Sequence, residues 1–169
     1  AITLMPIMNI GGMLLFKVLN TDSSDETLPS SKEISLKLVF IYFMLTMICA
    51  SAYKIFGMSF FDSITHSMTT IATGGFSNYN ESIGYFNNAK IEITAMLFII
   101  LGSLPFIAYI KFLNGNKKVF VNDTQIVTFV KLIIFSISII LLYLFFKVEN
   151  ISLTDLRSVS FNSISILTG

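Results

Sequence analysis

The chain has no tryptophan, one cysteine and one histidine, and only 12% of its 169 residues are charged. A single cysteine excludes an internal disulfide, so we interpret Cys49, which lies in an apolar run, as a small buried hydrophobic residue. Soluble domains carry roughly 25% charged residues, so this low proportion indicates that lipid surrounds much of the chain. A net charge of +1 provides no basic stripe to neutralise phosphates, which argues against nucleic acid as a partner.

Long apolar segments occupy most of the sequence. It is 54% hydrophobic with 17 phenylalanines, and its mean hydropathy is +0.78. We expect membrane-spanning helices at 34–57, 89–112 and 125–148, the end of an earlier one at 1–19, and polar loops at 20–33 and 113–124. Pro105, which follows Gly102 and Ser103, should kink the helix at 89–112.

Two shorter helices are expected at 60–70 and 153–166. Each follows a Ser-x-x-Asp pattern, beginning at Ser59 and at Ser152, in which the serine satisfies the first free N–H groups of the helix. The first of them, about 16 Å long, would reach only about half-way across a hydrocarbon core. The irregular loop that follows must therefore be enclosed by protein or line a wet cavity.

The order of span, short helix and loop occurs twice along the chain. A complete unit covers 34–112, and a partial unit covers 125–169. Repeats of this kind surround a common axis. The sequence therefore predicts an all-α membrane protein made of repeated units, each with a transmembrane helix, a re-entrant pore helix, a filter loop and a second transmembrane helix.

The loop after the first short helix has the composition of a site built from backbone. Residues 69–77 read Thr-Thr-Ile-Ala-Thr-Gly-Gly-Phe-Ser, with no carboxylate, cysteine or lysine for covalent or acid–base chemistry. Two adjacent glycines allow positive φ and close approach of carbonyl oxygens, which suits a dehydrated monovalent cation. The alternative is that the glycine pair is simply a helix C-cap and turn.

The polar side chains near this loop favour structural roles. His66 lacks a second metal ligand and is best interpreted as packed or hydrogen-bonded, and Asp62 as a helix cap. Thr69 and Thr70 would fasten the loop to its helix, whereas Thr73 could equally face an ion. Because these groups share one helix face, an intramembrane enzyme built around His66 stays an alternative, as does a membrane scaffold without conductance.

Lysine and arginine positions predict the orientation in the membrane. One side would carry Lys17, Lys32, Lys37, Lys111, Lys117, Lys118 and Lys131, and the other side Lys54, Lys90, Lys147 and Arg157. By the positive-inside rule the first set, with the loops at 20–33 and 113–124, is cytoplasmic. The glycine loop then opens to the outside.

Residues 61–77, FDSITHSMTTIATGGFS, followed by SIGYF at 82–86, closely resemble the second pore repeat of the bacterial Trk/Ktr potassium-uptake family, TrkH type. Pro6 with Gly11-Gly12-Met13 is similar to the end of that family's first repeat, and residues 161–165, FNSIS, to its third pore helix. The resemblance runs along the whole chain. We therefore expect a fragment of a longer protein, from the end of the first repeat to the start of the third.

The resemblance implies four span, pore-helix, span repeats in a pseudo-fourfold arrangement in the bacterial inner membrane. It implies selective K⁺ uptake, with K⁺ as the transported ion, no other cofactor and no enzymatic activity. It also implies a homodimer and a cytoplasmic nucleotide-binding regulatory subunit of the TrkA type. Whether transport is channel-like or that of a symporter coupled to H⁺ or Na⁺ stays open, and a Na⁺-permeable member of the same superfamily is the alternative.

The resemblance also assigns a selectivity filter within residues 71–77. Gly75 and Phe76 match the filter glycine and the aromatic residue after it, so K⁺ would contact the carbonyls of Ala72, Thr73, Gly74 and Gly75. The expected filter residues are Ile71, Ala72, Thr73, Gly74, Gly75, Leu167, Thr168 and Gly169. For the last three, a literal Thr-Gly match makes Gly169 a filter glycine, whereas the Phe161-Asn162 register places the family's glycine beyond residue 169.

Overall fold

The computed structural model describes residues 31–147 and 152–169, with side chains from residue 35 onward. Every regular element within these two stretches is helical. The helix end expected at 1–19 and most of the loop at 20–33 lie outside the described residues. In chain order the elements are α2 (Ser31–Ile55), α3 (Phe60–Ile71), the 3₁₀ helix η1 (Ser82–Phe86), α4 (Ala89–Ser103), α5 (Phe106–Leu113), α6 (Val119–Asn122), α7 (Thr124–Lys147) and α8 (Leu153–Thr168).

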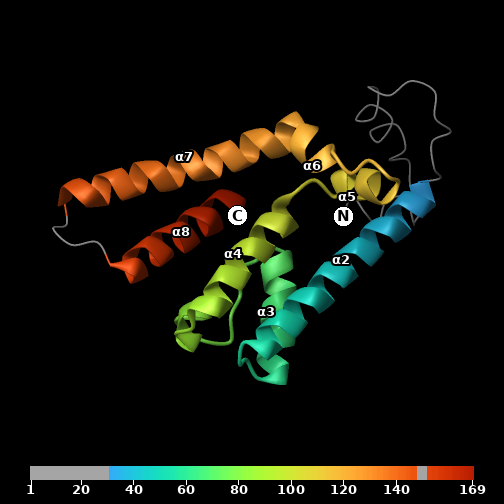
Figure 1. Ribbon diagram of the computed structural model, residues 1–169. Helices are drawn as coiled ribbons and strands as arrows, with labels where there is room; N and C mark the ends of the chain where they lie inside the picture. The colour runs from blue at the N-terminus through green and yellow to red at the C-terminus, as the bar shows by residue number, and fades with distance from the viewer. Residues whose placement is uncertain (1–30, 148–151) are drawn as a thin grey trace.

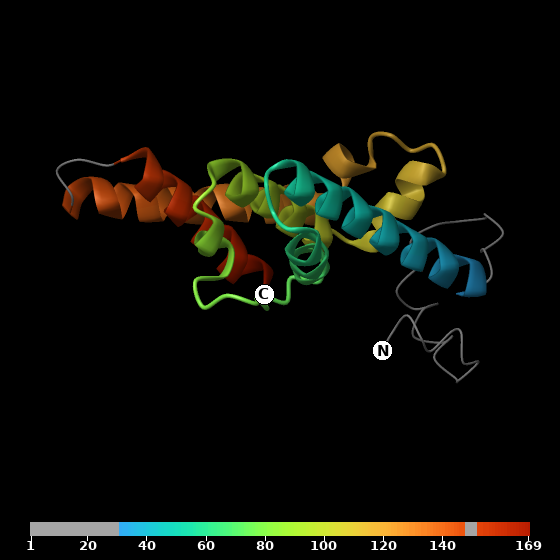
Figure 2. The same ribbon diagram turned by 90° about the horizontal axis from the view of Figure 1, so that it is seen from below.

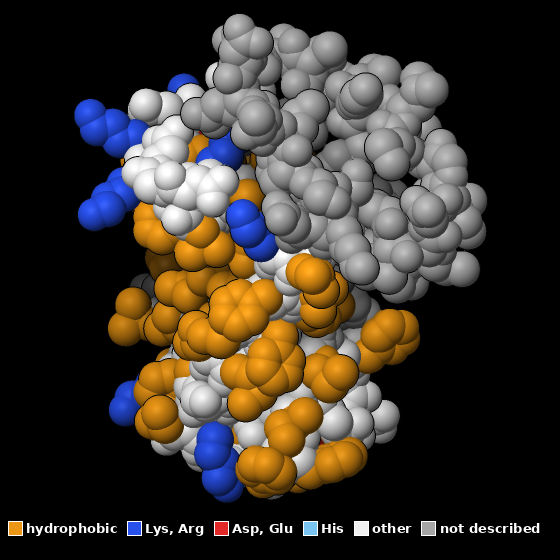
Figure 3. Space-filling model, turned by 90° about the vertical axis from the view of Figure 1, so that its right-hand side faces the viewer, with side chains coloured by type: hydrophobic (Ala, Val, Ile, Leu, Met, Phe, Trp, Pro, Cys, Tyr) orange, Lys and Arg blue, Asp and Glu red, His pale blue; other side chains and the backbone are white. Residues whose placement is uncertain are grey.

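Helices α2 and α7 are long and apolar enough to cross a membrane. The spans are Ser35–Ile55, with a mean hydropathy of 1.8, and Thr124–Lys147, with a mean hydropathy of 2.6. Large side chains on both are exposed, including Phe40, Phe43 and Phe135, as befits a surface that faces lipid. Figure 3 shows a broad hydrophobic surface with Lys and Arg side chains above and below it. The all-α membrane fold expected from the sequence is confirmed.

The apolar segment between α2 and α7, expected as one kinked helix at 89–112, is broken into two helices. Helices α4 and α5 meet at an angle of 85°, and together they could form one further span. Leu104 and Pro105 are both non-helical, with ψ of 149° and 120°, because proline has no N–H to continue the ladder and disfavours helical geometry in the residue before it. The Tyr109 hydroxyl donates to the Leu101 carbonyl at 2.7 Å and so satisfies an acceptor near the break.

Helix α3 lies between α2 and α4, and α8 packs against both α4 and α7 (Figures 1 and 2). One buried cluster joins the first unit and consists of Cys49, Tyr53, Met58, Ile71, Ile83, Ile91, Ala95 and Phe98. Cys49 is fully buried and free, as expected. A second cluster, Ile99, Ile133 and Ile164, joins α4 to α7 and α8. Helix α4 therefore connects the two short helices.

Both short helices begin at the serine caps that the sequence indicates. The Asp62 N–H donates to Ser59 Oγ at 3.0 Å at the start of α3. At the start of α8 the Asp155 N–H donates to Ser152 Oγ at 3.2 Å, and the Ser152 N–H donates back to the Asp155 carboxylate at 3.0 Å. These are the bonds of a capping box. The caps determine where each short helix starts and therefore where its C-terminal end lies.

Candidate functional site

Helix α3 ends in a turn whose left-handed residue is a threonine. The Gly74 N–H donates to the Thr69 carbonyl at 2.9 Å and the Thr73 N–H to the Thr70 carbonyl at 3.2 Å, as in a Schellman ending. Thr73 has φ of 49°, and Gly75 adds a second positive φ of 66°. A β-branched residue in this region is strained, and such strain is concentrated at functional sites. The glycine pair is thus more than a C-cap, because Gly75 redirects the chain after the cap is complete.

At the end of α3, four successive backbone carbonyl oxygens accept no hydrogen bond from any described residue. They belong to Ala72, Thr73, Gly74 and Gly75, whereas the bonds of the turn end on Met68, Thr69 and Thr70. The four residues are exposed or half-buried. Their oxygens are therefore open to water or to a cation. Ile71, the first residue of the expected filter, is instead the last residue of α3 and is buried in the core.

The threonine hydroxyls around the turn divide into two groups. Thr69 Oγ1 donates to the His66 carbonyl at 3.1 Å, and Thr70 Oγ1 lies 2.8 Å from the buried Tyr53 hydroxyl of α2. The Thr69 hydroxyl therefore bonds within α3 and the Thr70 hydroxyl fastens the end of α3 to α2, so both have structural partners, as expected. Thr73 Oγ1 makes no hydrogen bond within residues 31–147 and 152–169, and it is available to an ion or to water.

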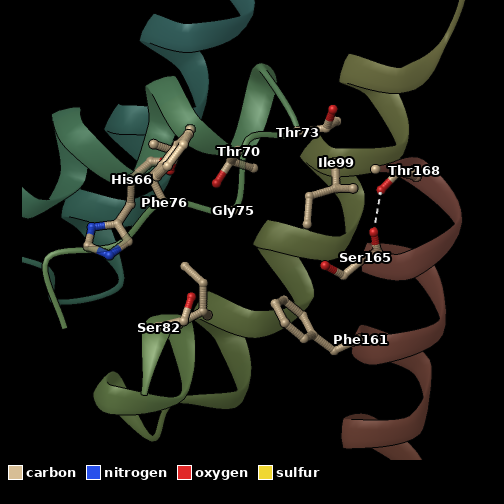
Figure 4. A pocket seen from close by; sticks show the side chains of 13 residues that line it. His66, Thr70, Thr73, Gly75, Phe76, Ser82, Ile99, Phe161, Ser165 and Thr168 are labelled. Atoms are coloured by element: carbon tan, nitrogen blue, oxygen red, sulfur yellow. Dashed lines mark hydrogen bonds between the residues drawn. The ribbon is translucent and has the colours of Figure 1, made fainter. Parts of the chain in front are cut away.

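The turn and the end of α8 line the same cavity, which has a volume of about 120 Å³. Thr73 and Gly75 contribute from the turn, and Thr168 and Gly169 from the second unit (Figure 4). A Cβ atom added to Gly169 would lie 3.6 Å from Thr73 Oγ1 and 3.9 Å from the Thr73 carbonyl oxygen. The structure therefore brings together residues from both expected halves of the site.

The three residues expected from the second unit have different geometries. Leu167 and Thr168 lie in the last turn of α8, where Thr168 Oγ1 donates to the Ile164 carbonyl at 2.9 Å. Gly169 has φ of 126° and is the position at which the chain leaves helical geometry. Leu167 packs against the cluster around Ile99 and does not line the cavity.

His66 is buried, and both of its ring nitrogens have partners. Nδ1 lies 2.9 Å from the Asp62 carbonyl oxygen and Nε2 lies 3.0 Å from Ser77 Oγ. Within the described residues, no group of three or more His, Cys, Asp or Glu side chains could hold a metal ion. The structural interpretation of His66 is confirmed.

Ser59 is the N-cap of α3, and Asp62, its partner in the capping pattern, accepts two hydrogen bonds at its carboxylate. The Ser59 hydroxyl donates at 2.7 Å and the Tyr79 hydroxyl at 3.1 Å. These donors, Ser59 first, hold the pKa of Asp62 below its ordinary value. The carboxylate is therefore charged near the positive N-terminal end of the α3 dipole.

Two features that position the site were missed in the sequence. Helix α4 approaches the end of α3 so closely that a Cβ on Gly102 would lie 2.5 Å from the Ile71 carbonyl oxygen. Arg157 Nε of α8 lies 2.6 Å from Glu92 Oε2 of α4 and joins the two units. For the Glu92–Arg157 ion pair, the sequence offered only two opposite charges near the starts of two helices. The Gly102-Ser103 dipeptide was interpreted only as a site of helix bending, not of close helix packing.

Comparison with known proteins places these features in a family. The family model of TrkH, described as a cation transport protein, matches residues 1–167. The Trk system potassium uptake protein TrkI of Halomonas elongata is 34% identical over 170 residues, covering 99% of this chain and 34% of TrkI. The Trk system potassium uptake protein TrkH of Salmonella typhimurium is 31% identical over 172 residues, covering 99% of this chain and 36% of that protein.

A solved structure has the same fold. The crystal structure of the potassium transporter TrkH from Vibrio parahaemolyticus matches with a TM-score of 0.78 and 28% identity, covering 98% of this chain and 34% of that one. The chain thus spans about a third of the length of these relatives. Since the family model matches nearly the whole chain and relatives above 30% identity align with 99% of it, this chain belongs to the TrkH family of cation transport proteins.

Proposed function

We propose that this chain forms part of the pore of a potassium-uptake protein, with residues 71–77 as one segment of its selectivity filter. The observation that carries the proposal is the run of donor-free carbonyls from Ala72 to Gly75 on a turn that directly follows a half-membrane helix. The C-terminal end of α3 carries the negative end of the helix dipole, about half an elementary charge, which stabilises a cation there. Rings of carbonyl oxygens replace the hydration shell of an ion in membrane pores.

The second unit supports a filter assembled from several repeats. The end of α8 lines the same cavity as the turn, with Gly169 next to Thr73. A ring of carbonyls around one axis requires such convergence of segments that are distant in the chain. Leu167, Thr168 and Gly169 stay predicted filter residues of this unit, and Gly169 has a non-helical φ of 126°.

The names of the relatives favour K⁺ as the ion and transport as the activity. The relatives from Halomonas elongata and Salmonella typhimurium are named potassium uptake proteins. A Na⁺-permeable pore is the alternative within the same architecture. The intramembrane enzyme around His66 is disfavoured, because the partner of its Nδ1 is the Asp62 backbone carbonyl rather than a carboxylate, and among the described residues no cluster of His, Cys, Asp or Glu could hold a metal ion.

We further propose that the protein lies in the inner membrane with the loop at 71–77 facing outside. The start of α2 lies on the same side as α5 and α6, away from the start of α3 and η1 (Figure 1). The first side carries Lys37, Lys111, Lys117 and Lys118, which supports a cytoplasmic location by the positive-inside rule. Assembly as a homodimer with a regulatory subunit of the TrkA type, and coupling to H⁺ or Na⁺, are parts of the proposal that rest on the family resemblance.

Gly75→Asp in the full-length protein tests the filter, with Rb⁺ uptake measured in a host that lacks its own potassium-uptake systems. Gly115→Asp is the matched control. Both glycines have positive φ, of 66° and 102°, and neither has an atom within 4 Å of an added Cβ. The two variants therefore introduce the same charge at a position of positive φ, with backbone strain at Gly115 at least as large as at Gly75, but only Gly75→Asp lies at the cavity.

We expect Gly75→Asp to abolish uptake and Gly115→Asp to preserve it. Undiminished uptake by Gly75→Asp would remove the filter assignment. No uptake by inserted wild-type protein would favour the scaffold or the enzyme. Equal Na⁺ and Rb⁺ uptake by the wild type would favour the Na⁺-permeable alternative.

A further inference from the structure

From Ser77, the last residue of the proposed filter segment, the chain runs back beside α3 and is tied to it at three successive residues. Ser77 Oγ lies 3.0 Å from His66 Nε2. The Asn78 side-chain amide donates to Thr65 Oγ1 at 3.1 Å, and the Tyr79 hydroxyl donates to the Asp62 carboxylate at 3.1 Å. The segment therefore runs antiparallel to α3, and each successive residue pairs with one nearer the start of the helix.

The bond between Ser77 and His66 is the tie nearest to the filter, and its direction follows from its surroundings. The Asp62 carbonyl can only accept, so His66 Nδ1 carries the proton and donates to it. In the neutral ring Nε2 is then an acceptor for the Ser77 hydroxyl. Ser77 Oγ in turn accepts the Tyr79 N–H at 3.1 Å, which leaves its own hydrogen for the histidine.

The His66 ring is held in place by packing as well as by hydrogen bonds. Its side chain is 1% exposed. The edge of the Phe86 ring contacts it at a centroid distance of 5.4 Å and an interplanar angle of 87°. The Asn78 tie, in contrast, is exposed. The His66–Ser77 bond is part-buried, so water replaces it less readily than the exposed Asn78 tie and it fixes geometry more firmly.

We propose that His66 and Ser77 are positioning residues that set the K⁺ over Na⁺ selectivity of the filter, an inference that rests on the proposed function. The loop is anchored at its start by the bond from the Gly74 N–H to the Thr69 carbonyl. The His66–Ser77 bond anchors it at its last residue. Among the described residues, Gly75 and Phe76 between these two anchors make no hydrogen bond, so both anchors determine where the Gly75 carbonyl, the last of the four proposed ion contacts, lies.

The expected effect is a change in selectivity rather than a loss of transport. A filter discriminates between ions by the position and number of its carbonyl dipoles. Loss of this part-buried neutral hydrogen bond lets the loop adapt to a smaller ion. We expect the K⁺ over Na⁺ ratio to fall about threefold to tenfold, the factor that corresponds to one such bond.

Four variants of the full-length protein, reconstituted in liposomes, separate this role from general stability. Ser77→Ala removes the hydroxyl. His66→Asn keeps a donor where Nδ1 lies but removes the acceptor for Ser77, whereas His66→Gln places an amide oxygen where Nε2 lies and keeps it. Asn78→Ala removes the neighbouring exposed tie and is the matched control. Rb⁺ and Na⁺ uptake are measured in parallel on each sample.

A lower Rb⁺ to Na⁺ ratio in Ser77→Ala and His66→Asn, with a wild-type ratio in His66→Gln and Asn78→Ala, would support the inference. An unchanged Rb⁺ to Na⁺ ratio in Ser77→Ala overturns the inference, even if Rb⁺ uptake, Na⁺ uptake and the amount of protein all decrease together. If His66→Asn does not fold, the result for Ser77→Ala decides alone. A ratio that falls equally in His66→Gln and His66→Asn also overturns it. Full uptake by Gly75→Asp refutes the proposed function itself, whereas loss of uptake in that variant with normal selectivity in Ser77→Ala refutes only the positioning role.

Discussion

Gly102→Ala tests how closely α4 must approach the filter. The added methyl group would lie 2.5 Å from the Ile71 carbonyl oxygen and 3.2 Å from both the carbonyl carbon and the Cα of Ile71. All three atoms are backbone, so no side chain can rotate away. Helix α3 is also held on its other side by the hydrogen bond between Thr70 and Tyr53. The helices must therefore separate to accommodate the methyl group.

The size of the separation follows from the contact distances. Ordinary van der Waals contact begins at 3.4 Å, so the methyl group must move away from the Ile71 oxygen by about 0.9 Å, the difference between 3.4 and 2.5 Å. Overpacking of this kind costs typically about 1–3 kcal/mol. Because Ile71 is the first residue of the proposed filter segment, a displacement of nearly 1 Å would also misplace the carbonyl of Ala72, and a site this much out of position loses function.

The assay is thermal unfolding of the full-length protein in detergent together with Rb⁺ uptake. Gly84→Ala is the control, because an added Cβ there meets no atom within 4 Å and Gly84 does not have positive φ. We expect Gly102→Ala to unfold several degrees lower and to transport more slowly, while Gly84→Ala behaves as wild type. Equal stability and uptake in the two variants would show that α4 does not constrain the end of α3 in this way.

Two further predictions concern charged groups at the edges of the site. Glu92→Gln leaves Arg157 without its ionic partner, and the Glu92 and Arg157 side chains are only 12% and 23% exposed. We therefore expect thermal unfolding to show a loss of about 1–3 kcal/mol in stability. The exchange Glu92→Arg with Arg157→Glu should recover part of this loss, and a double variant whose destabilisation equals the sum of the two single ones would contradict the pairing. The lowered pKa of Asp62 means that its stabilising effect is present above the ordinary value of about 4 and is lost as the pH falls through the lower folded-state value. Asp62→Asn should therefore flatten the loss of thermal stability in acid, and parallel curves for variant and wild type would show that this carboxylate is not responsible.

The features that could be predicted from the sequence are those decided by a few neighbouring residues. The caps at Ser59 and Ser152 depend on a hydroxyl and a backbone N–H three residues away. The burial of Cys49 follows from the apolar run around it, and the bonded state of His66 follows from the lack of a second metal ligand nearby. Apolar length alone identifies α2 and α7 as spans.

The remaining features depend on packing between distant segments. Pro105 predicts a bend, but the 85° angle between α4 and α5 also depends on the burial of Leu104, which packs in a hydrophobic cluster with Ala108, Val119 and Ile126. The glycine pair predicts positive φ, which Gly75 adopts, but the left-handed residue of the helix cap is Thr73, since the cap bonds to Thr69 and Thr70 define the turn. Such choices are made by tertiary contacts rather than by local preference.

The central claim is that backbone oxygens of the turn after α3 hold the transported ion. It is tested most directly by anomalous diffraction from the full-length protein crystallised with Rb⁺ or Tl⁺ in place of K⁺. We expect an anomalous peak within coordinating distance of the carbonyls of Ala72, Thr73, Gly74 and Gly75, absent in Gly75→Asp. An anomalous peak at another place, with these four carbonyl oxygens accepting hydrogen bonds from protein donors instead, would contradict the account.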